Sequence, residues 1–162
     1  MPEEQIKVLC VEKSHELGNK RRDEIAKAVF KARRIHSDFP GLNICVDMFD
    51  GALKRDFSLY DVLITDIRCD FEDREAPHQP YQENITPKAK GAFLAERAKR
   101  ANPYIITIAL TGASATHNAF GKMGAVTQKE ILGLQEYTLF DKVIYKKEDY
   151  GDEIVRYLQN RL

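Results

Sequence analysis

Five short apolar segments, separated by stretches of helical character, constrain the fold of this chain more than any other feature. Most are rich in β-branched residues and show little alternation between polar and apolar positions. Strands covered on both faces, as in a parallel sheet, have this composition. The predicted strands span residues 6–11, 42–46, 60–65, 104–110 and 142–145.

The segments between these strands have the spacing of amphipathic helices. We predict helices over 23–35, 88–101, 131–134 and around 154–162, while the link over 50–59 allows only a short helix. Strands that alternate with helices imply right-handed crossovers and an open α/β sheet.

The length of 162 residues is typical of one domain with a single core. Two stretches, near 70–87 and 114–135, are longer than the loops such a fold needs. We therefore expect a single domain over 1–162 with two insertions.

Charge and hydropathy exclude several classes of protein. Lys plus Arg and Asp plus Glu both number 25, which argues against nucleic-acid binding or membrane-surface binding held mainly by charge. No apolar run approaches the roughly 20 residues that span a bilayer, so we expect a cytoplasmic protein. The basic run Lys20, Arg21 and Arg22 is expected on a solvated face of the first helix, and Cys10 in the core.

Polar side chains follow the predicted strands where their carboxyl ends meet. Glu12 and Lys13 follow the first strand, Asp66 the third, Thr111 the fourth and Lys146 the fifth. In open α/β sheets the functional crevice lies at this edge. An aspartate there can attack a phosphoryl group, a cation bound by carboxylates can neutralise charge, and a hydroxyl and a lysine can bind phosphoryl oxygens.

Each of these residues also has an ordinary structural interpretation. Asp66 can be a polar strand end, Glu12 a solvated carboxylate and Thr111 a turn cap. Lys13 and Lys146 can be lysines that reach into solvent. The joint pattern favours a site, because residues far apart in the chain all fall at one edge of the predicted sheet.

With these motifs in order, the chain resembles the receiver domain of two-component response regulators over 7–162. Asp66 in LITDI stands at the phospho-acceptor position, Thr111 in IALTGAS at the conserved hydroxyl and Lys146 in DKVIYKK at the conserved lysine. Gly91 matches the glycine that opens the third helix. The resemblance implies a flavodoxin-like, doubly wound, five-stranded parallel sheet of strand order 2-1-3-4-5.

The resemblance also implies a site chemistry. Asp66 would accept a phosphoryl group, and Thr111 and Lys146 would engage its oxygens. Mg²⁺ would be held by Glu12, by Asp66 and by the backbone carbonyl of Arg68.

One departure from the family pattern bears on the metal. Receivers carry two adjacent acidic residues after the first strand, and here the pair is Glu12 and Lys13. An ammonium near Asp66 would stabilise the carboxylate and compete with bound Mg²⁺.

The resulting hypothesis is a stand-alone, non-enzymatic signalling module that receives a phosphoryl group from a histidine kinase and acts on a downstream protein. It binds neither membrane nor nucleic acid directly, and homodimer formation is left open. One alternative is a pseudo-receiver adaptor that works without phosphorylation. A second alternative is a small α/β enzyme or nucleotide-binding protein that uses the same crevice.

Overall fold

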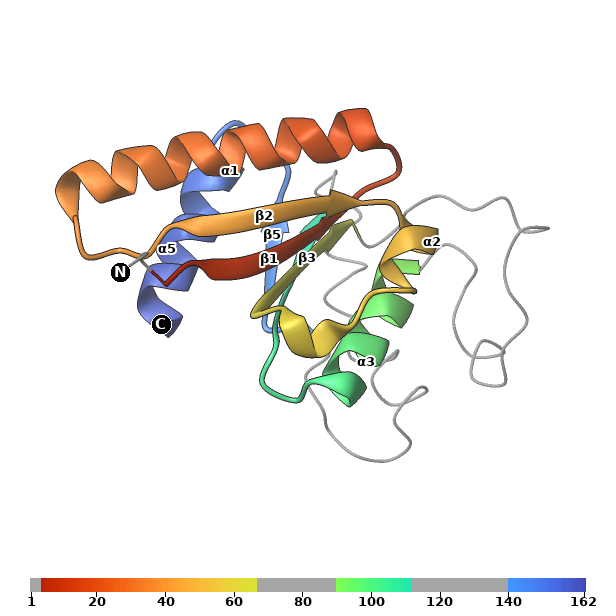
Figure 1. Ribbon diagram of the computed structural model, residues 1–162. Helices are drawn as coiled ribbons and strands as arrows, with labels where there is room; N and C mark the ends of the chain where they lie inside the picture. The colour runs from red at the N-terminus through yellow and green to blue at the C-terminus, as the bar shows by residue number, and fades with distance from the viewer. Residues whose placement is uncertain (1–3, 67–89, 112–139) are drawn as a thin grey trace.

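A five-stranded parallel sheet forms the centre of the protein (Figure 1). The computed structural model describes residues 4–66, 90–111 and 140–162. The strand order is β2-β1-β3-β4-β5, so the predicted flavodoxin-like, receiver-type sheet is confirmed. The strands are β1 (Ile6–Val11), β2 (Leu42–Asp47), β3 (Val62–Asp66), β4 (Ile106–Thr111) and β5 (Lys142–Tyr145).

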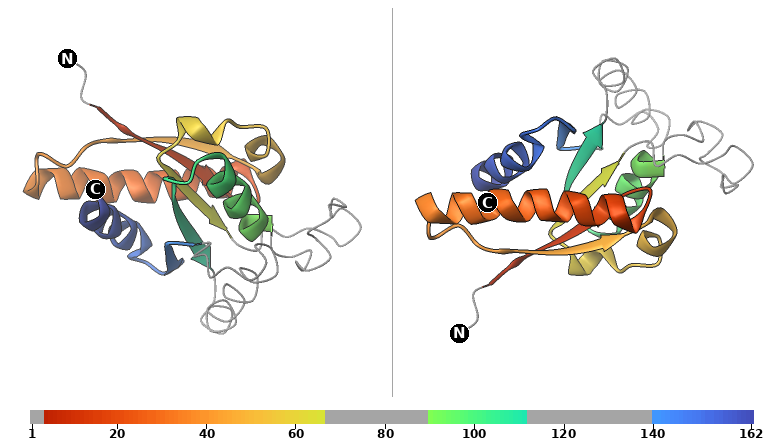
Figure 2. Two further views of the ribbon diagram at one scale, coloured as in Figure 1. Left: turned by 90° about the horizontal axis from the view of Figure 1, so that it is seen from below. Right: turned by 90° about the horizontal axis from the view of Figure 1, so that it is seen from above.

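Helices cover both faces of the sheet (Figure 2). On one face lie α1 (His15–Ile35) and α5 (Tyr150–Arg161). On the other lie α2 (Phe49–Ala52), the 3₁₀ helix η1 (Phe57–Leu59) and α3 (Lys90–Ala101).

Two apolar layers result, because successive side chains of a strand point to opposite faces. Leu9 and Leu63 pack toward α3, in a cluster with Phe93. Val8 and Ile64 pack toward α1 and α5, in a second cluster. Burial on both faces explains why the strand sequences show so little polar–apolar alternation.

The first helix begins earlier than its apolar periodicity predicts. We expected a start at residue 23, whereas α1 begins at His15. The side chain of Ser14 accepts a hydrogen bond from the backbone N–H of Leu17 at 3.2 Å, which is the geometry of a helix N-cap. The two additional turns place the start of the helix beside the carboxyl edge of the sheet.

Some expectations concern parts of the chain outside the described residues. They include the insertions near 70–87 and 114–135 and the helix at 131–134. The single-domain organisation over 1–162 stays a prediction. Within the described residues, no helix combines the length and the apolar character needed to cross a bilayer.

Candidate functional site

The candidate site lies at the carboxyl edge of the sheet, where β1, β3 and β5 end. Val11 pairs with Thr65 in the parallel register, so the residues that follow them, Glu12 and Asp66, are neighbours on adjacent strands. Lys146 comes directly after β5.

A partly buried lysine joins the two carboxylates. The Nζ of Lys146 donates a hydrogen bond to Oδ2 of Asp66 at 2.9 Å and lies 3.1 Å from Oε2 of Glu12. The exposed fractions of the side chains are 13% for Lys146, 7% for Asp66 and 1% for Glu12. Three of the predicted site residues are therefore in direct contact.

Arg21, on α1, binds the same glutamate from the other side. Its Nε donates a hydrogen bond to Oε2 of Glu12 at 2.8 Å. Its guanidinium donates to the hydroxyl of Tyr150 at 3.5 Å and lies 5.4 Å from the centre of that ring. We call Glu12, Arg21, Asp66 and Lys146 the carboxyl-edge network.

The expectation that Arg21 lies on a solvated face is therefore wrong. Lys20 and Arg22 are exposed as expected, but Arg21 belongs to the buried stripe of α1, together with Gly18 and Ile25. Spacings of three and four residues put these positions on one helix face. The signal was the N-cap at Ser14, which extends the helix far enough back to include Arg21 in the stripe.

Hydrogen bonding decides the ionisation of Arg21. Burial alone would lower the pKa of the guanidinium, but its hydrogen bonds with Tyr150 and Glu12 raise that pKa above its ordinary value. Burial also raises the pKa of the Tyr150 hydroxyl. The site thus holds a permanent guanidinium beside a neutral phenol.

The remaining predicted residues are only partly placed. Thr111 is the last residue of β4, and its backbone pairs with Tyr145. Lys13 is exposed at the step from β1 to α1. Arg68 lies outside the described residues, so the roles of Thr111 and Arg68 stay predictions.

The side chains at this edge do not fit a magnesium ion as they lie. Mg²⁺ takes carboxylate and water oxygens in a near-octahedral shell. Here Glu12 and Asp66 are bound by the cationic groups of Arg21 and Lys146 instead. The described ranges also contain no group of three or more His, Cys, Asp or Glu residues that could hold a metal ion.

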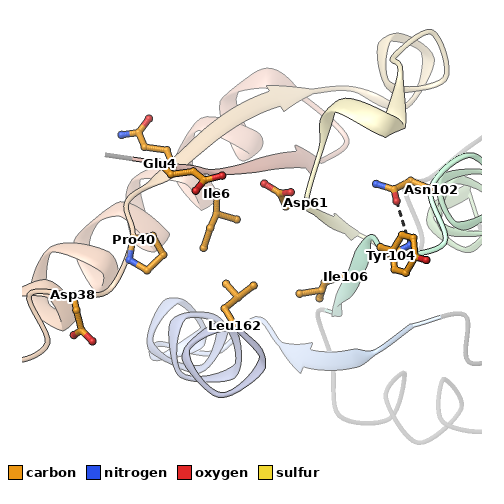
Figure 3. A pocket seen from close by; sticks show the side chains of 10 residues that line it. Glu4, Ile6, Asp38, Pro40, Asp61, Asn102, Tyr104, Ile106 and Leu162 are labelled. Carbon is orange, nitrogen blue, oxygen red and sulfur yellow. Dashed lines mark hydrogen bonds between the residues drawn. The ribbon is translucent and has the colours of Figure 1, made fainter. Parts of the chain in front are cut away.

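A separate pocket of about 490 Å³ lies at the opposite, amino edge of the sheet (Figure 3). Ile6, Ile106 and Leu162 point into it, and the acidic side chains that line it come from Glu4, Asp38 and Asp61. Among the described residues no lysine or arginine lines this pocket. Its chemistry therefore does not favour the phosphate groups of a nucleotide.

Comparisons with known proteins detect this fold by structure and not by sequence. No protein-family model matches the chain, and no curated protein sequence matches it either.

Among solved structures, a response regulator receiver domain protein from Clostridium thermocellum has a TM-score of 0.55 and 18% identity, covering 96% of this chain and 95% of its own. A response regulator receiver protein from Sinorhizobium medicae has a TM-score of 0.54 and 16% identity, with 97% and 96% covered. A chemotaxis response regulator of Vibrio cholerae has a TM-score of 0.53 and 14% identity, with 98% and 100% covered. At these identities the similarity establishes the architecture alone. The chain therefore has the fold of response regulator receiver domains.

Proposed function

We propose that this chain is a receiver-like signalling module that acts by binding other proteins, and that its site at Asp66 works without phosphorylation. The observation that supports this proposal is the carboxyl-edge network. Both of its carboxylates are already paired with cations that belong to the chain itself, the buried Arg21 and the partly buried Lys146.

The network opposes phosphoryl transfer in two ways. The side chain of Asp66 is 7% exposed, which restricts the approach of a phosphodonor. A phosphoryl group on Asp66 would add negative charge beside Glu12, whose neutralising cations are already engaged. Such a site is held in one arrangement, so the surfaces around it present one conformation to a partner.

Intact-mass measurement after incubation with a small acyl phosphate and MgCl₂ tests the proposal. We expect no gain of a phosphoryl group in the wild-type chain. Asp66→Asn is the matched control, because it keeps the shape of the side chain and removes the nucleophile. A mass gain in the wild type that is absent from D66N would overturn the proposal.

The second candidate is phosphoryl acceptance on Asp66, which the 2.9 Å contact between Asp66 and Lys146 favours. In that reaction a carboxylate oxygen of Asp66 attacks the phosphorus of a phosphohistidine on a kinase partner. The P–N bond breaks and an aspartyl phosphate forms. Lys146 and Thr111 would then bind the phosphoryl oxygens.

Binding partners distinguish the two candidates further. An adaptor binds its downstream protein equally well as wild type and as D66N, because Asp66 acquires no modification. If Asp66 is instead phosphorylated, D66N binds the downstream protein more weakly than the wild type does when a kinase is present. Light scattering on the chain without its partner measures its molar mass and so tests for a homodimer.

A further inference from the structure

We propose that Arg21 takes the place of a divalent metal ion as the positive charge on Glu12, so that the carboxyl-edge site is independent of metal. This inference deepens the proposed function and rests on it, since it names what holds the site in the absence of phosphorylation. The two fail separately. Metal binding by the wild type overturns the inference, whereas phosphorylation of Asp66 overturns the proposed function.

The first support is the state of Glu12, whose two oxygens are both engaged. Oε2 lies 2.8 Å from Nε of Arg21 and 3.1 Å from Nζ of Lys146. Oε1 lies 3.4 Å from the same Nζ. At 1% exposure the side chain has no water shell to exchange for a metal ion. A metal could bind Glu12 only by displacing one of its two cations.

The second support is the charge of the network. Glu12 and Asp66 supply two negative charges, and Arg21 and Lys146 supply two positive charges. A divalent cation that entered this neutral group would be repelled by a guanidinium and an ammonium at close range. Carboxylates attract Mg²⁺ when they retain net negative charge, and these four groups together retain none.

The third support is that Arg21 is fixed in place. Tyr150 accepts a hydrogen bond from its guanidinium, and the arginine is 9% exposed. Gly151 of α5 lies so close to α1 that a Cβ added to it would be 2.7 Å from the backbone oxygen of Glu24. This close packing of the two helices maintains the contact between Arg21 and Tyr150. If Glu12 turned toward a metal, a buried guanidinium would lose its carboxylate, which is strongly unfavourable.

The test compares Mg²⁺ binding by the wild type, Arg21→Gln and Arg22→Gln. Arg22→Gln is the matched control, because it makes the same change of charge at the next position of α1, where the side chain is 44% exposed. Binding is measured by calorimetric titration with MgCl₂, and from the shift in the urea midpoint that the ion causes. Arg21→Lys serves as the conservative variant that keeps the charge.

We expect no saturable binding by wild type, R22Q or R21K at millimolar Mg²⁺. We expect saturable binding by R21Q in this range, with an affinity at least about tenfold above the upper limit that the control sets. Saturable binding by the wild type in this range overturns the proposal, as does a folded R21Q that gains none. If R21Q does not fold in metal-free buffer, it is refolded with Mg²⁺ and followed by far-UV circular dichroism. Recovery of the helical signal supports the proposal, and failure to recover overturns it.

Discussion

Replacing Glu12 by glutamine should be among the most destabilising substitutions in this protein that preserve the shape of a side chain. The substitution keeps the volume and shape of the side chain and removes one negative charge at a position that is 1% exposed. It leaves Arg21 buried without a carboxylate partner, with the neutral hydroxyl of Tyr150 3.5 Å away. Lys146 is affected less, because it retains Asp66 at 2.9 Å.

The magnitude follows from this difference between the two cations. Removing one partner of a buried ion pair costs about 3–5 kcal/mol of the free energy of unfolding, because the other charge stays buried without compensation. The glutamine carbonyl can still accept one hydrogen bond from Arg21, so we expect the lower end, about 3 kcal/mol. For a chain of this size such a loss lowers Tm by about 6–12 °C.

Urea unfolding followed by far-UV circular dichroism measures the effect. The matched control is Glu24→Gln, which removes the same charge from a surface pair with Lys27 at 3.4 Å. An exposed pair of this kind contributes about 0–1 kcal/mol. In a double-mutant cycle, E12Q and R21Q together should cost at least about 1 kcal/mol less than the sum of the single changes. A loss for E12Q no larger than that for E24Q, or additive single effects, would show that the network does not form in solution.

Three further predictions concern packing, burial and reactivity. Gly151→Ala should cost about 1–3 kcal/mol of stability in urea unfolding, because its Cβ would lie 2.7 Å from the backbone oxygen of Glu24, whereas Gly41→Ala, which meets the side chain of Gln5 at 3.3 Å, should cost less. Burial raises the pKa of Glu96 above its ordinary 4.5, so ionisation of this carboxyl destabilises the fold as pH rises through the raised value. Glu96→Gln should therefore raise Tm at pH 7 relative to wild type and leave it unchanged below pH 4.5, and an equal shift at both pH values would contradict this reasoning. Burial raises the pKa of the Cys10 thiol to about 12, so an alkylating reagent should modify Cys10 in urea and spare it in the native protein, as peptide mapping by mass spectrometry would show.

The strands could be predicted from the sequence because burial on both faces makes their composition continuously apolar, whereas their order was implied by the resemblance to receiver domains. Segments such as β1 and β3 are apolar at consecutive positions, and few other structures tolerate that pattern in a chain of this charge content. Once the sheet is parallel, the meeting of Glu12, Asp66 and Lys146 follows from topology, since the carboxyl ends of its strands share one edge.

The role of Arg21 could not be predicted in the same way. A run of three basic residues predicts a solvated surface, and composition alone does not show which of the three side chains is buried. Its burial follows from the helix N-cap at Ser14, which starts α1 at His15, and apolar periodicity does not contain that local signal. Its partner Tyr150 lies 129 residues away in sequence, so that contact depends on how α1 and α5 pack.

The connectivity of the network relates the site to the helical face of the protein. Glu12 directly follows β1 and Arg21 lies in α1, whereas Lys146 directly follows β5 and Tyr150 is the first residue of α5. Their contacts therefore link two strand–helix units that lie far apart in sequence. Any change at Asp66 that drew Lys146 away from Glu12 would alter the charge that faces Arg21, and through Arg21 the start of α5. In an adaptor that works without phosphorylation, the same contacts hold α1 and α5 in a fixed relation, and a partner that recognises both helices would bind a surface that is already ordered.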